Sequence, residues 1–150
     1  SVCQTAETED FLRAGRALGE AIRQTDRKVV LLASGALSHT FWSLRELRKH
    51  EAADPKHIFT PEAYAADRER IAMFEAGDHA KVLETMPDFM KYKPEAKFGH
   101  YLEMIGAMGE ADVIAPGRLY GEYENSIGTG QVHVWFDRPA TGWHRTTSAA

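Results

Sequence analysis

Hydrophobic positions recur at two different spacings near the start of the chain, and each spacing predicts a different element. Residues 8–25 carry apolar side chains every three or four positions, which predicts an amphipathic helix with Thr8 as its N-cap. Residues 28–34 are apolar on both alternate faces, which predicts a buried, parallel strand. A helix followed by a buried strand is typical of an α/β protein.

Three more helices are predicted in the middle of the chain. Thr60 and Pro61 form an N-cap and first-turn pair for a long helix, and Gly77 ends it. Asp78 begins a short helix directly afterwards. From Pro94 onward the spacing predicts a helix with one apolar stripe, made of Phe98, Leu102, Ile105 and Gly109. A further short helix is expected within residues 41–50.

The carboxy-terminal part has the pattern of a strand pair. Residues 118–124 and 131–137 predict two strands, joined by a glycine-rich connection at residues 126–130. His133 alternates with valines on either side, so it is expected to face away from them. The small and polar residues 139–150 predict a flexible tail, which leaves residues 1–138 as one structural unit.

Composition and charge exclude several classes of protein. The 150 residues are 43% hydrophobic and 27% charged, as in an ordinary soluble globular protein. A net charge of −4 argues against a nucleic-acid surface or an anionic membrane surface, which would need clustered cations. The longest apolar run is too short to span a bilayer. A single cysteine, Cys3, suits the reducing cytoplasm.

Glu95 is the first candidate for chemistry, because its position can be argued from helical geometry. It precedes Phe98 by three residues and Leu102 by seven, so in a continuous helix it extends the apolar stripe and points inward. An inward carboxylate requires a metal, an arginine or backbone donors. The alternative is a first-turn glutamate that complements the helix dipole. Glu103, later in the same predicted helix, should face elsewhere.

His39 is the second candidate, since it ends the loop that follows the predicted strand. Ligands of open α/β sheets bind at the carboxyl ends of strands, and an imidazole titrates near neutral pH. These facts favour a general acid–base at residue 39. The alternative is a histidine that only holds its loop by bonding to the backbone. The other histidines show no compact spacing for metal ligands.

Two segments carry a resemblance to a known family. Residues 27–39, ending in Leu37-Ser38-His39, and residues 125–131, with Gly128-Thr129-Gly130, resemble segments of the type III extradiol dioxygenases, the family of protocatechuate 4,5-dioxygenase. The resemblance runs to about residue 139. It implies the carboxy-terminal half of an α/β fold, a mixed-sheet sandwich with flanking helices.

The resemblance also implies a reaction. His39 falls on the family's acid–base histidine, and Glu95 falls on the carboxylate ligand of a non-haem Fe(II), with Glu103 as the alternative ligand. The implied substrates are O2 and a catechol or o-aminophenol, whose ring is cleaved beside its paired heteroatoms. Two histidines and one carboxylate hold Fe(II) and leave positions open for these substrates.

The chain departs from the family pattern in length. Family members are about twice as long, and their two iron-binding histidines lie in the first half, for which nothing here substitutes. We therefore expect an amino-terminal half or a partner chain to complete the site, within an oligomer. The alternative is a non-catalytic partner subunit, or scaffold, on the same fold.

Overall fold

The fold is described from a computed structural model, for residues 5–51, 55–58 and 60–144. Its helices are α1 (Thr8–Arg23), α2 (Pro61–Ala76), α3 (His79–Glu84), α4 (Met86–Phe89) and α5 (Gly99–Met108). Its strands are β1 (Gly117–Ser126) and β2 (Thr129–Phe136), which form an antiparallel hairpin. Short 3-10 turns occupy Leu47–His50, Pro55–His57, Met90–Tyr92, Glu95–Phe98 and Glu110–Asp112. None of the helices within the described ranges is long and apolar enough to cross a membrane.

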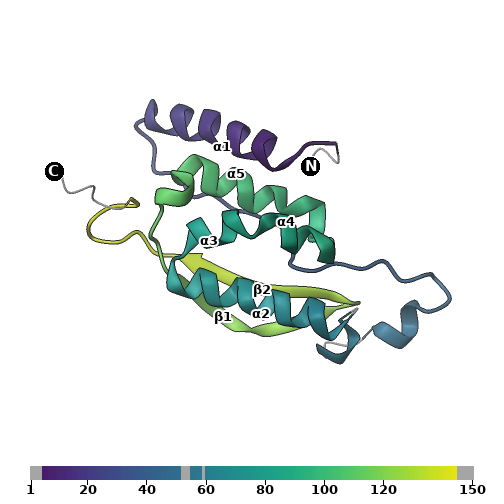
Figure 1. The fold of residues 1–150 in the computed structure, drawn as a ribbon. Coiled ribbons are helices and arrows are strands. Elements are labelled where there is room, and N and C mark those ends of the chain that lie inside the picture. Colours follow the sequence, from purple (N-terminus) through teal and green to yellow (C-terminus); the bar gives the residue numbers. More distant parts are fainter. Residues whose placement is uncertain (1–4, 52–54, 59, 145–150) are drawn as a thin grey trace.

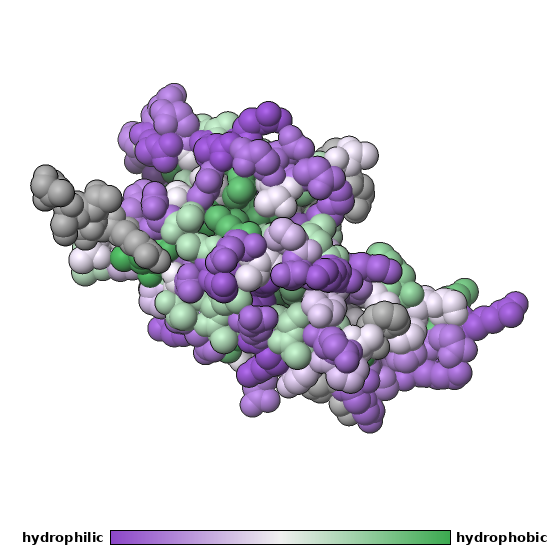
Figure 2. All heavy atoms as spheres, in the orientation of Figure 1, coloured by the Kyte–Doolittle hydropathy of each residue, from purple (hydrophilic) through white to green (hydrophobic). Residues whose placement is uncertain are grey.

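The elements are arranged in layers (Figure 1). Helix α1 lies along α5 at one side, α3 and α4 follow, and α2 lies against the hairpin at the other side. Side chains from all these layers form one core, which includes Phe74, Leu102 and Ile105. In the space-filling view, hydrophilic residues cover the outer side of α1, and hydrophobic residues show between α1 and the elements below it (Figure 2). Helices with a β-hairpin confirm the predicted α/β class.

Most of the predicted element positions are confirmed. The first helix begins at Thr8, although Glu7 rather than Thr8 is its N-cap. The hydroxyl of Thr60 accepts a hydrogen bond from the backbone N–H of Ala63, and Gly77 ends α2 in the left-handed conformation. On β2, His133 is exposed while its valine neighbours are half-buried. Of residues 41–50, only Leu47–His50 are helical, as a 3-10 turn.

The prediction of a buried strand at residues 28–34 is wrong. The segment has no strand assignment, and the exposed fractions of Val30 and Leu32 are 64% and 87%. A strand needs a neighbour to pair with its backbone. No backbone–backbone hydrogen bond joins residues 28–36 to any other described residue. The apolar pattern is therefore present without the pairing that would make it a strand.

The predicted helix from Pro94 is also corrected, because α5 begins only at Gly99. Ala96, Lys97 and Phe98 all have positive φ, between 51° and 62°, which interrupts helical geometry between Glu95 and α5. The stripe itself holds within α5, where Leu102 and Ile105 are completely buried. Glu95 lies before this interruption and is not on the stripe.

The expected tail at residues 139–150 lies partly outside the described residues. In the described part, the backbone N–H of Ile114 donates to the carbonyl of Trp143 over 2.9 Å, and His144 forms an isolated antiparallel bridge with Val113. Residues 139–144 thus return to the body of the protein. Residues 145–150 are outside the described ranges.

Helices α1 and α5 approach closely through glycines. A Cβ on Gly15 would lie 2.2 Å from the carbonyl oxygen of Glu103, and one on Gly106 would lie 2.6 Å from the carbonyl oxygen of Leu12. These distances are shorter than any van der Waals contact, so the helix spacing requires glycine at both positions.

Replacing Gly15 with alanine tests this spacing. Alanine is favoured over glycine inside a helix by about 1 kcal/mol, but here it forces α1 away from α5. We expect the free energy of unfolding, measured with urea, to fall by about 1–3 kcal/mol. Ala17→Val, on the exposed side of α1, is the matched control and should cost only a few tenths of a kcal/mol. A Gly15→Ala chain more stable than the original would contradict the packing argument.

A buried histidine connects the helical layers. His79 has no exposed surface, and its Nε2 lies 2.8 Å from the carbonyl oxygen of Ala115, which can only accept a hydrogen bond. Nε2 therefore carries the proton, and Nδ1 accepts from the hydroxyl of Tyr101, also over 2.8 Å. Burial lowers the pKa of His79 below its ordinary value of 6.5, against the opposing effect of the bond to Ala115.

The lowered pKa of His79 makes stability depend on pH. Below about pH 6.5 the unfolded chain binds a proton at this histidine while the folded chain does not, so the free energy of unfolding should decrease as the pH falls. Urea unfolding between pH 7.5 and 5.5 would measure this loss, up to about 1.4 kcal/mol per pH unit. His79→Gln keeps a donor for Ala115 and cannot titrate. An equally steep loss in that variant would show that other groups are responsible.

Candidate functional site

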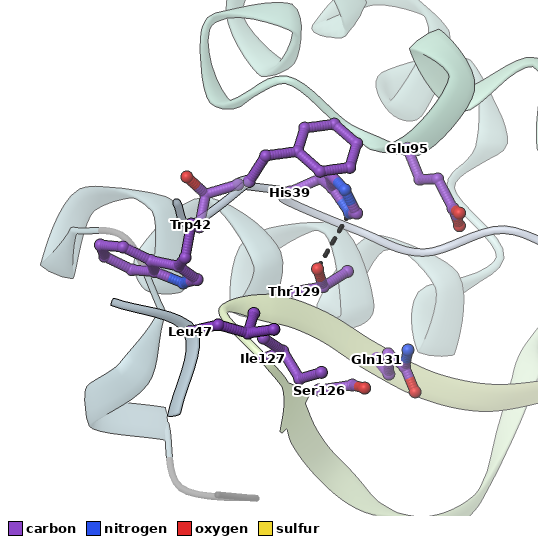
Figure 3. Close-up of a pocket in the computed structure, with 10 residues that line it drawn as sticks. His39, Trp42, Leu47, Glu95, Ser126, Ile127, Thr129 and Gln131 are labelled. Atoms are coloured by element: carbon purple, nitrogen blue, oxygen red, sulfur yellow. Dashed lines mark hydrogen bonds between the residues drawn. The ribbon is translucent and has the colours of Figure 1, made fainter. Parts of the chain in front are cut away.

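The candidate site is a pocket of about 300 Å³ that contains both residues singled out from the sequence (Figure 3). His39 reaches it from the loop before the first 3-10 turn, and Glu95 reaches it from the turn before α5. We call it the His39 pocket, and it is lined by His39, Thr40, Phe41, Trp42, Leu47, Glu95, Ser126, Ile127, Thr129 and Gln131. The alternative carboxylate, Glu103, does not line it. On α5, the backbone of Glu103 faces α1 instead.

The imidazole of His39 is held from one side. Its Nδ1 lies 2.9 Å from the hydroxyl oxygen of Thr129 at the start of β2. Its Nε2 is shielded from solvent and has no hydrogen-bond partner among the described residues. The ring of Phe41 packs edge-on against it, with 4.4 Å between ring centroids. When Nδ1 donates its proton to Thr129, the lone pair of Nε2 remains available to a ligand.

Backbone contacts connect the His39 loop to Glu95. The N–H of Glu95 donates to the carbonyl of Leu37 over 3.2 Å, and the N–H of His39 donates to the carbonyl of Tyr92 over the same distance. The Glu95 side chain is exposed and makes no hydrogen bond or ion pair with the rest of the described chain. Glu95 thus lines the pocket with a carboxylate that has no other partner in the described chain. The turn before α5 positions it there, and not the face of a helix.

The described residues do not form a metal site by themselves. Nowhere in the described ranges do three histidine, cysteine or acidic side chains come together in a way that could hold a metal ion. In the His39 pocket, Glu95 is the carboxylate with the right chemistry for an iron ligand, and His39 is the imidazole beside it. These residues fit one ligand position of an iron site and do not complete it.

A buried carboxylate missed by the sequence analysis lies directly behind the pocket. Asp67 on α2 has no exposed surface, and it accepts hydrogen bonds from the backbone N–H and the hydroxyl of Ser38 at 2.8 and 2.7 Å. The hydroxyl of Tyr123 on β1 donates to it as well, over 2.7 Å. Burial raises the pKa of Asp67, and the donors from Ser38 and Tyr123 oppose that rise. Helical spacing could have found this residue, because Asp67 precedes Ile71 by four positions and Phe74 by seven.

An aromatic group borders the other side of the pocket. The indole of Trp42 stacks on the imidazole of His50, with 3.5 Å between ring centroids and nearly parallel planes. His57 packs edge-on against His50 at 5.6 Å. Trp42 contributes to the pocket wall together with Leu47 and Ile127, so this wall is mainly apolar. The sequence pattern gave no sign of the stack, because Trp42 lies in an irregular loop, where no spacing rule relates it to His50.

Comparison with known proteins defines the class to which this chain belongs. Residues 1–137 match the family model described as the catalytic LigB subunit of aromatic ring-opening dioxygenase. The chain is a member of this LigB family, which confirms the resemblance to the extradiol dioxygenases.

One curated relative can be named. The 2-aminophenol 1,6-dioxygenase beta subunit of a Pseudomonas species is 31% identical over 138 residues, which are 91% of this chain and 44% of the relative. The chain thus spans less than half the length of that relative.

Removing the hydroxyl of Tyr123 tests the contact behind the pocket. Tyr123→Phe deletes a donor that stabilises the ionised Asp67 carboxylate, so the pKa of Asp67 should rise further. A pH titration followed by carboxyl ¹³C NMR of Asp67 would measure the change. Tyr64→Phe is the matched control, since the Tyr64 ring packs edge-on against Tyr123 and no bond from it to Asp67 is present. An unchanged or lower pKa in Tyr123→Phe would contradict the assignment.

Proposed function

We propose that this chain supplies the acid–base histidine and the carboxylate iron ligand of an extradiol dioxygenase, which uses O2 to open the ring of a catechol or o-aminophenol. The observation that carries the proposal is that His39 and Glu95, far apart in the sequence, line one pocket. Membership of the LigB family supports ring opening as the class of reaction. The relative's name supports aminophenols among the substrates.

His39 acts in this proposal as the group that moves protons. Thr129 fixes the ring through Nδ1, and Nε2, which has no partner in the described chain, keeps its lone pair for the substrate. Nε2 then accepts the proton of a ring O–H or N–H group when the substrate binds. The same nitrogen returns the proton as the ring opens. An imidazole suits both steps, because its ordinary pKa lies close to neutral pH.

Glu95 acts as one of three protein ligands to Fe(II). Its carboxylate is free of other partners in the described chain, as a ligand must be. When bound, iron supplies open coordination positions for the paired heteroatoms of the ring and for O2. Once the completing polypeptide covers it, the apolar side of the pocket, formed by Phe41, Trp42 and Ile127, would exclude water from the reacting atoms.

The two remaining iron ligands come, in this proposal, from an amino-terminal half or a partner chain within an oligomer. The relative is more than twice as long as the part of it that this chain matches. Residues 28–34 offer a surface for the additional polypeptide, because they are extended, apolar and mostly exposed, and they lead directly into the His39 loop. A strand paired along this segment would bury its valines and leucines beside the pocket.

Paired substitutions in the completed enzyme test the two roles. His39→Asn should leave the iron content nearly intact and slow ring cleavage by about 10²–10⁴-fold, because only proton transfer is lost. Glu95→Ala should lose the metal, because it removes one of three protein ligands. Iron content and O2 uptake would be measured together, with 2-aminophenol and catechol as substrates.

Matched controls use residues that do not line the pocket. Glu103→Ala and His133→Asn remove the same functional groups elsewhere, and both variants should keep iron and activity. Loss of iron in His39→Asn, with iron and activity retained in Glu95→Ala, would reverse or void the assignment. If neither pocket substitution changed turnover, a non-catalytic subunit on the same fold would be the better account.

A further inference from the structure

We propose that Asp67 is a positioning residue, which holds the His39 imidazole in the orientation in which Nδ1 contacts Thr129 and Nε2 is left without a partner in the described chain. The proposal rests on the acid–base role proposed for His39, and it concerns a residue outside the pocket. Asp67 is completely buried, does not line the pocket, and has its hydrogen bonds with Ser38 and Tyr123. It acts through Ser38, which directly precedes His39 in the chain, and through Tyr123 on β1.

When its carboxylate is ionised, Asp67 accepts all three of its hydrogen bonds. The backbone N–H of Ser38 donates to Oδ1, while the hydroxyls of Ser38 and Tyr123 both approach Oδ2. An ionised carboxylate can only accept, so both hydroxyl protons point toward Asp67. The peptide between Leu37 and Ser38 is therefore fixed to α2 from inside the protein. The backbone of the next residue, His39, is fixed with it.

The segment that holds Thr129, which binds the imidazole, is joined to the same loop. The N–H of Leu37 donates to the carbonyl of Gly130 over 2.9 Å, and the N–H of Gly130 donates to the carbonyl of Ser38 over 3.0 Å. These two bonds join the His39 loop to the beginning of β2, where Thr129 contacts Nδ1 of His39. Both ends of the contact between His39 and Thr129 are thus attached to segments that adjoin Asp67.

Gly130 shows how closely the carboxylate fits against β2. A Cβ at this position would lie 2.1 Å from Oδ2 of Asp67 and 2.5 Å from the hydroxyl oxygen of Tyr123. Any other residue would displace the carboxylate from Ser38 or push β2 away from the loop. The absence of a side chain at Gly130 therefore leaves room for the buried carboxylate, and the carboxylate holds the loop through Ser38.

The alternative is that Asp67 only stabilises the fold. Ile71, one turn further along α2, provides the comparison, because it is equally buried and has no hydrogen-bonding group. A substitution at Ile71 lowers stability through packing alone. A positioning role predicts that His39 responds to changes at Asp67 and does not respond to changes at Ile71.

The experiment observes the imidazole directly, in the 150-residue chain with ¹⁵N-labelled histidine. Long-range ¹H–¹⁵N NMR at about pH 8, where a free imidazole is neutral, reports which ring nitrogen carries the proton. The native chain should show distinct Nδ1 and Nε2 signals for His39. In Asp67→Asn these signals should move toward the averaged values of an unanchored ring. His133, exposed on β2, should not change.

Ser38→Ala is the second variant, and it keeps the proposal testable if Asp67→Asn does not fold. It removes one of the three donors and keeps the backbone N–H, so the His39 signals should move in the same direction by a smaller amount. Ile71→Val should leave them in place. Unchanged His39 signals in the folded Asp67 and Ser38 variants would overturn the proposal, as would an equal change in Ile71→Val.

This measurement needs neither iron nor substrate, so its outcome is separate from that of the proposed function. Averaged His39 signals in Asp67→Asn, together with a completed native enzyme that does not cleave the ring, would support the positioning role and contradict the proposed dioxygenase function. Unchanged signals together with the expected activity losses would do the reverse.

Discussion

The interaction on which the site depends is the burial of one carboxylate among three hydrogen-bond donors. Removing an ionised aspartate from water is costly, and only good hydrogen bonds offset the cost. Asp67 obtains these bonds from the loop before the pocket and from the hairpin beyond it. Those segments are far apart in the sequence. The hydrogen bonds to this one carboxylate therefore hold α2, the loop and the hairpin together. The pocket forms where they meet.

Local patterns were sufficient to predict α1, α2 and the hairpin. α1, α2 and the β1–β2 pair follow from apolar spacing, capping residues and glycines, all of which act over a few neighbouring residues. The segment at 28–34 could not be predicted in this way. Its apolar pattern is typical of a buried strand. A strand also requires a partner strand, elsewhere in the chain or in another chain. Periodicity carries no information about whether that partner is present.

Counting along a helix gave the wrong geometry for Glu95, although it would have located Asp67. Counting residues along a helix locates a side chain only where the helix is continuous. Three left-handed residues separate Glu95 from α5, so its place on the pocket follows from a turn and from the bond to Leu37. α2 has no such interruption, and the same counting applied to Asp67 would have placed an acidic residue among Ile71 and Phe74. An acid on a continuous buried stripe is therefore the stronger signal of the two.

The exposed extended segment also affects how this chain behaves by itself. Residues 29–33 are Val-Val-Leu-Leu-Ala, without a charge or a proline, and their backbone groups form no backbone pairs within the described chain. Short uncharged segments with high β-propensity are the ones that nucleate cross-β aggregation when they are left uncovered. The flanking Lys28 opposes such aggregation only weakly, because it places a single charge at one end of the segment. The same five residues that we propose pair with an additional polypeptide therefore favour self-association when they are left uncovered.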